Sequence, residues 1–131
     1  MSKPYDAATK ALIETDPAGW VEFLGYPVPA QSVRLVDADL ATVSAEADQV
    51  IRVEQPSPWL LHIELQASRD ESLARRLLRY NALLHHRHGL PVWSVAVLLR
   101  QAANLSTLQG ELRFDPPVGT PWSFRYGVVR V

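Results

Sequence analysis

The sequence has no cysteine among its 131 residues and only one methionine. Without cysteine there is neither a disulfide framework nor a thiolate metal site. It also lacks an uninterrupted apolar run of about 18 residues, the length that a membrane-spanning helix needs. No apolar stretch follows the basic start of the chain, so we expect no signal peptide. These absences together predict a cytoplasmic protein with no membrane partner.

A strong net charge is absent too, since the formal value is −1. This argues against a protein that coats DNA along its whole surface. The charge is nevertheless unevenly spread, with 4 basic and 9 acidic residues in positions 1–58 but 9 basic and 5 acidic residues in positions 59–131. An arginine-rich binding face and an ordinary solvated helix face both explain the cluster in the second half. Its members are Arg69, Arg75, Arg76, Arg79 and Arg87.

Length and composition indicate one globular domain over residues 1–131, with 47% apolar and 21% charged residues. A chain of this size can bury a substantial core. It stops inside the last strand that we expect, so a truncated C-terminus is one interpretation of where it ends.

The most informative stretch is residues 59–66, Trp-Leu-Leu-His-Ile-Glu-Leu-Gln. Strand side chains alternate between two faces. We therefore expect the face with Leu61, Ile63 and Leu65 to pack on the core. The other face carries a histidine, a carboxylate and an amide in a row, which favours a functional site.

A turn over residues 55–58, Gln-Pro-Ser-Pro, precedes this strand and follows a second strand candidate at residues 48–53. A hairpin centred on Pro56 places Asp48 opposite Glu64. Directly opposed β-carbons are about 5 Å apart, and two carboxylates at that distance repel by roughly 3 kcal/mol at an effective dielectric of 20. A proton, a cationic side chain or a divalent metal must offset this repulsion. A one-residue slip would place Gln49 opposite Glu64 instead.

The other expected elements follow from capping, turn and periodicity patterns. Asp37 and Asp39 interrupt the first expected strand; we place Asp37 on an exposed face and leave Asp39 open as an additional acid. The strand–helix–strand order around the long helix predicts a parallel pair, with the second strand buried on both faces. The expected helices are residues 6–14, 16–25 and 70–88, and the remaining expected strands are residues 32–44, 92–99, 107–114 and 122–131.

This order, α-β-β-β-α-β plus C-terminal strands, resembles the PD-(D/E)XK nuclease superfamily. It implies an α/β (α+β), restriction-endonuclease-like mixed sheet flanked by helices. The motifs resemble more closely those of the recombination-promoting nuclease and transposase family. They are His-Ile-Glu-Leu-Gln at residues 62–66, Arg-Leu-Leu-Arg-Tyr at residues 76–80 and Gly-Leu-Pro-Val at residues 89–92.

The resemblance implies a metal-dependent DNA endonuclease associated with transposition or recombination. Mg²⁺ or Mn²⁺ would be held by the carboxylates of Asp48 and Glu64 and by the backbone carbonyl of Leu65. Gln66 stands where the family pattern usually has lysine. Its amide can orient a water molecule but supplies no positive charge. Ala47 stands where the pattern has proline.

The same helix motif implies that Arg76 and Tyr80 contact the substrate, DNA. Their spacing of four residues places both on one edge of the helix. For Tyr80, packing in the core is an equal alternative. For Arg76, the alternative is that it only frames the wall of the site. For Asp48 and Glu64, the alternative to metal binding is neutralisation by Arg52, Arg69 or Arg76.

Three further residue groups have simpler interpretations. His62 is expected to be a hydrogen-bonded strand residue rather than a ligand. The cluster His85-His86-Arg87-His88 is explained by the negative end of the helix dipole, although His85 and His88 could bind a metal. We assign the tryptophans to the core.

The competing function is a catalytically inactive nuclease-like module that dimerises or binds a partner; a homodimer fits either function.

Overall fold

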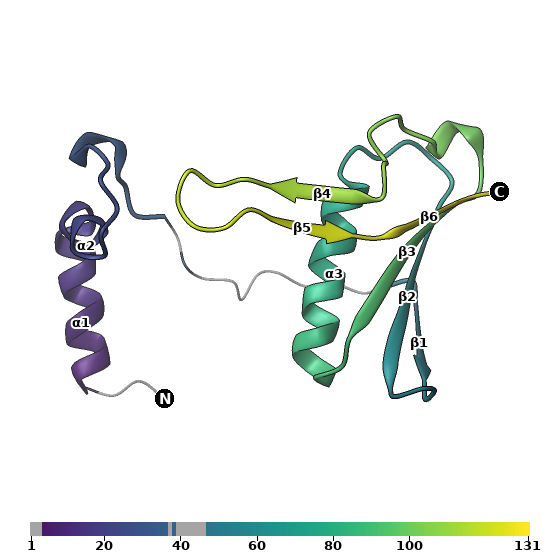
Figure 1. Ribbon diagram of the computed structural model, residues 1–131, viewed down its shortest axis with the longest axis horizontal. Helices are drawn as coiled ribbons and strands as arrows, with labels where there is room; N and C mark the ends of the chain where they lie inside the picture. Colours follow the sequence, from purple (N-terminus) through teal and green to yellow (C-terminus); the bar gives the residue numbers. More distant parts are fainter. Residues whose placement is uncertain (1–3, 37, 39–46) are drawn as a thin grey trace. The chain divides into compact units, whose positions relative to one another are not determined.

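The computed structural model describes residues 4–36, 38 and 47–131 (Figure 1). The chain divides into two compact units, residues 1–43 and residues 44–131. The interpretation of residues 1–131 as one domain stays a prediction. Over the described ranges, none of the helices combines the length and the apolar character needed to cross a membrane.

The first unit contains the helices α1 (Pro4–Thr15) and α2 (Pro17–Phe23) and the short 3-10 helix η1 (Ala30–Ser32). Asp16 caps α2, accepting a 3.0 Å hydrogen bond from the Gly19 N–H. Pro17 occupies the first helical position, where its missing N–H costs nothing. Both helices were predicted, and the structure confirms them.

The strand predicted for residues 32–44 is wrong where the structure describes it. Ser32 ends η1, and residues 33–36 belong to no strand. Among the described residues no strand pairs with this segment, and Val36 is 70% exposed. Asp37 and Asp39 lie outside the described residues, as do residues 40–44 of that predicted strand.

The second unit is built on a four-stranded sheet with the strand order β1-β2-β3-β6. The strands are β1 (Gln49–Val53), β2 (Trp59–Gln66), β3 (Val92–Leu98) and β6 (Gly127–Arg130). β1 is antiparallel to β2, whereas β3 runs parallel to β2 and to β6. The predicted mixed α+β class and the parallel strand–helix–strand unit are thus confirmed.

The connecting helix is α3 (Leu73–His88), which lies beside the sheet (Figure 1). It begins three residues later than predicted, so Asp70 and Glu71 precede its first turn. The reason is local: the Asp70 carboxylate accepts hydrogen bonds from the Ser72 N–H and hydroxyl, which fixes a turn there. The helix ends as predicted at Gly89, whose φ of 67° is left-handed.

The core lies on the sheet face that α3 covers, and this corrects the prediction for β2. Leu60, His62 and Glu64 point into the protein, whereas Leu65 on the opposite face is 46% exposed. The polar row of β2 is therefore the enclosed one. The residues that form the main core cluster are Leu73, Ala74, Leu77, Ala96, Leu98, Ala103, Leu105, Leu108, Phe124 and Tyr126.

β3 was predicted to be buried on both faces, and this is wrong as well. Ser94, Ala96 and Leu98 are buried against the core, but Trp93 on the other face is 43% exposed. An apolar run cannot show by itself whether one face or both are covered. The half-exposed apolar sheet face, as we call it here, consists of Ile51, Leu61, Ile63, Leu65, Trp93, Val95, Val97 and Val129.

The last predicted strand, residues 122–131, is two strands in two sheets. β5 (Trp122–Arg125) pairs with β4 (Glu111–Phe114), and after Tyr126 the chain joins the main sheet as β6. The β4–β5 hairpin extends past α3 (Figure 1). Trp122 stacks on Phe114 there and is 50% exposed, so the assignment of all tryptophans to the core is wrong for Trp93 and Trp122.

Candidate functional site

The register of the β1–β2 hairpin is the predicted one. Gln49 pairs with Ile63 and Val53 pairs with Trp59, so the slip by one residue does not occur. The residue before β1 is Asp48, and its backbone N–H donates a 2.8 Å hydrogen bond to Glu64 Oε2. The two predicted acids therefore adjoin at the end of this strand pair.

A second hydrogen bond fixes the side chain of Asp48. The N–H of Leu65 donates to Asp48 Oδ2 at 2.9 Å. Because the N–H and C=O of one strand residue point to the same side, the Leu65 carbonyl also points toward the β1 edge. β1 starts at Gln49, so the ladder pairs no β1 residue with Leu65. Asp48, Glu64 and this carbonyl thus converge on one edge of the sheet.

Each of the two carboxylates keeps one oxygen for another partner. Among the described residues, all hydrogen bonds of these side chains use Asp48 Oδ2 and Glu64 Oε2. Asp48 is exposed to solvent, whereas Glu64 is only 3% exposed. Asp48 Oδ1 and Glu64 Oε1 are therefore the atoms that a cation would use.

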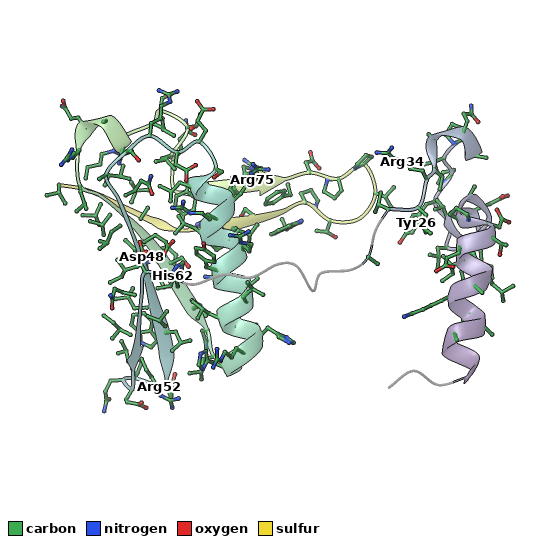
Figure 2. All side chains as sticks on the ribbon, turned by 180° about the vertical axis from the view of Figure 1, so that it is seen from behind. Tyr26, Arg34, Asp48, Arg52, His62 and Arg75 are labelled. Carbon is green, nitrogen blue, oxygen red and sulfur yellow. The ribbon has the colours of Figure 1, made fainter. Side chains whose placement is uncertain are left out.

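A chain of buried, hydrogen-bonded polar side chains holds Glu64 in place. His62 is fully buried; its Nε2 lies 3.2 Å from Glu64 Oε2 and its Nδ1 lies 2.7 Å from Ser94 Oγ. The Asn81 amide in turn donates to Ser94 Oγ at 3.1 Å and to the Val92 carbonyl at 2.8 Å. Figure 2 shows His62 next to Asp48, with Arg52 at the other end of β1.

Burial favours the neutral form of the His62 imidazole. Burial lowers its pKa below the usual 6.5, and the neighbouring carboxylates of Glu64 and Asp48 oppose that shift only in part. Since a carboxylate only accepts, Nε2 carries the proton and donates to Glu64. The Ser94 hydroxyl then donates to Nδ1. The interpretation of His62 as a hydrogen-bonded strand residue agrees with this geometry.

Gln66 ends β2 with both halves of its amide engaged. Its Nε2 donates to the Ser68 carbonyl at 2.8 Å, and its Oε1 accepts from Arg76 at 3.0 Å. An amide has two N–H donors and two lone pairs on its oxygen, so one of each remains for a water molecule. Arg76 also pairs with Asp70 at 2.7 Å. The structure thus brings Gln66 and Arg76 together.

The arginines that could have neutralised the two acids pair elsewhere. Arg52 pairs with Glu54 and Arg69 pairs with Glu71, both on the surface, while Arg76 pairs with Asp70. The repulsion between Asp48 and Glu64 is therefore not offset by these side chains. Backbone N–H groups and His62 bond one oxygen of each carboxylate, and among the described residues the other oxygen of each has no hydrogen-bond partner.

Tyr80, on α3, contacts both His62 and Arg79. Its ring meets that of His62 edge to face at 5.7 Å, and the Arg79 guanidinium lies 5.1 Å from the ring centroid. The side chain is partly buried, so it has both a packing contact and an accessible edge. The ring contact joins Tyr80 of α3 to the buried histidine of β2.

Sequence reasoning missed Ser94, Asn81 and Asp70. A serine within the apolar run of residues 92–99 was the available signal, because a buried hydroxyl requires a hydrogen-bond partner. The His85–His88 cluster lies in the last turn of α3, and His85 Nδ1 lies 2.8 Å from the Leu90 carbonyl. Over the described ranges, no group of three or more histidines or acids is arranged to hold a metal.

The donor set at Asp48 and Glu64 fits magnesium in its chemistry. Mg²⁺ prefers oxygen ligands, is commonly bound by one or two carboxylates and keeps several waters. Two adjoining carboxylates and a strand carbonyl meet that requirement without a third acid. His62 bonds Glu64 Oε2, so a cation bound here would use Oε1.

Comparisons with known proteins assign no relatives to the chain. No protein-family model matches it, and no curated protein or solved structure matches it at a significant level. A function for this chain is therefore inferred from the geometry of the site and from the motif resemblance.

Proposed function

We propose that this chain is a metal-dependent DNA endonuclease that hydrolyses phosphodiester bonds. The observation that carries the proposal is the 2.8 Å hydrogen bond from the Asp48 N–H to Glu64 Oε2, which holds two acids side by side without an arginine between them. Adjoining carboxylates with one open oxygen each favour a divalent cation. Association with transposition or recombination is proposed from the motif resemblance alone.

In this proposal Asp48, Glu64 and the Leu65 carbonyl hold Mg²⁺ or Mn²⁺. When bound, the cation would activate water and neutralise the charge that develops on the phosphate. His62 orients Glu64 through its Nε2–H, and Ser94 fixes the imidazole tautomer. Gln66 positions water with the remaining N–H and lone pair of its amide, while Arg76 holds that amide in place.

Plasmid nicking tests this function. The full chain should convert supercoiled DNA to the open-circular form with Mg²⁺ or Mn²⁺, and EDTA should stop the reaction. Glu64→Ala and Asp48→Ala should abolish nicking, whereas Glu54→Ala, an exposed acid beyond the other end of β1, should not. Nicking that survives both site substitutions would disprove the assignment.

A second function has one observation in its favour. The half-exposed apolar sheet face includes Leu65, Trp93 and Val129, each more than 40% exposed. Contiguous apolar surface commonly marks a protein–protein contact. A catalytically inactive module that dimerises or binds a partner would show no Mn²⁺ binding in calorimetry, together with self-association in sedimentation experiments.

A further inference from the structure

A hollow of about 350 Å³ lies on the first half of α3, outside the residues assigned above to the metal. It is lined by Ser72, Arg75, Arg76 and Arg79. These positions are spaced by three and four residues, so they share one helix face. Figure 2 shows Arg75 near the first turn of α3. Three arginines and a serine line the hollow, which favours an anionic ligand.

The charge in this hollow is poorly compensated. Arg75 and Arg79 are exposed and, among the described residues, neither forms an ion pair with a carboxylate. The Arg79 guanidinium lies instead over the Tyr80 ring, and Arg76 alone has an acid partner, Asp70. Like charges four residues apart on a helix are destabilising, so this face gains from a bound anion.

Arg76 connects the hollow to the candidate metal site. Its guanidinium donates to Gln66 at the end of β2, two residues beyond Glu64. Its Nε is buried and has no hydrogen-bond partner in the described structure. An anion in the hollow would therefore bind beside the Gln66 amide, to which we assign the positioning of water.

We propose that this hollow binds a backbone phosphate of DNA next to the scissile phosphate; the assignment rests on the proposed function. Arginine suits this role because its planar donor fork matches phosphate oxygens. Phosphate contacts fix the position of the duplex without reading its sequence. Arg75 and Arg79 thus fix the path of the DNA strand past Gln66.

The test is duplex binding in EDTA, measured by fluorescence anisotropy over a series of NaCl concentrations. Each phosphate contact adds about 0.9 to the magnitude of the negative slope of log affinity against log salt concentration. In the variant Arg75→Ala/Arg79→Ala the magnitude of this slope should therefore be smaller by about 1 to 2. Arg87→Ala, at an exposed position in the last turn of α3, is the matched control and should leave the slope unchanged.

An unchanged slope in the double variant, an equal loss in Arg87→Ala, or no duplex binding by the wild type would each overturn the proposal. Inorganic phosphate is titrated in parallel by calorimetry. Phosphate binding that needs Arg75 and Arg79, with duplex binding that does not, would make the hollow a small-anion site and also overturn it. Asp48→Ala should keep the wild-type slope, so a failure of hydrolysis is distinguishable from a failure of this inference.

Discussion

The imidazole Nε2 of His62 lies 3.2 Å from Glu64 Oε2, and both side chains are almost completely buried. A histidine two residues from an acid on one strand points to the same face, so the sequence spacing makes this contact possible. The covering helix α3 makes it strong, because it removes water from both groups. Glu64 is thus held rigidly, while Asp48 at the neighbouring position remains exposed.

Replacing His62 should destabilise the protein. His62→Ala leaves a cavity and removes hydrogen-bond partners from Ser94 and Glu64, so we expect the free energy of unfolding to fall by about 2–4 kcal/mol. Urea denaturation followed by circular dichroism measures this. His86→Ala, an exposed histidine on α3, should change stability by less than about 0.5 kcal/mol. Equal losses of stability in the two variants would contradict a role for His62 in the buried chain of hydrogen bonds.

Stability should also depend on pH through His62. Its pKa in the folded protein is lowered by burial, so below pH 6.5 the unfolded chain takes up a proton that the folded chain does not. The free energy of unfolding is therefore highest above pH 6.5. It decreases as the pH falls below that value, by at most about 1.4 kcal/mol per pH unit. Denaturation curves between pH 7 and pH 5 should show this decrease.

The variant His62→Gln, which cannot titrate, should show a flatter pH profile over the same range. Asp70 does not interfere, because hydrogen bonds from Ser72 lower its pKa below 3.8. Its contribution is present above that value and is lost only in more acidic solution. A wild-type stability that is constant from pH 7 to pH 5 would rule out a neutral, buried His62.

Much of this site could be predicted from the sequence, because it depends on local geometry. The turn at Pro56 and the period of β2 determined the pairing of Asp48 with Glu64. What could not be predicted was which face of β2 is enclosed. Alternation separates Leu61 from His62, but only the tertiary position of α3 decides which of them is covered.

The departures in the rest of the fold have similar causes. Asn81 joins the buried chain because α3 packs against β3, a contact that no spacing within the helix specifies. Tyr126 divides the last predicted strand between two sheets, and an apolar run cannot indicate such a division.

Changing Gln66 to the lysine usual in the resembled family should impair this protein. Gln66 Oε1 accepts from Arg76 at 3.0 Å, and an ammonium group there would repel the guanidinium and offer no acceptor. We expect Gln66→Lys to reduce the initial rate of Mg²⁺-dependent plasmid nicking. Gln109→Lys, the same change in an exposed loop, should leave the rate unaltered. Faster nicking by Gln66→Lys than by the wild type would refute the role given to Arg76.

The end of α3 gives a prediction that is independent of function. Gly89 has a φ of 67°, and a β-carbon there would meet no atom within 4 Å, so only backbone strain opposes substitution. Gly89→Ala should cost about 1–2 kcal/mol of stability. Gly89→Asn should cost less, because asparagine tolerates the left-handed region. Thermal denaturation of both variants checks the order, and equal losses would speak against a left-handed cap.

If Asp48 and Glu64 share one divalent cation, anomalous scattering from crystals soaked with Mn²⁺ will locate that cation. One peak is expected within bonding distance of Asp48 Oδ1 and Glu64 Oε1, and it should be absent from crystals of Asp48→Ala. A protein that binds Mn²⁺ only at His85–His88, or shows no peak between the two carboxylates, would contradict a shared cation.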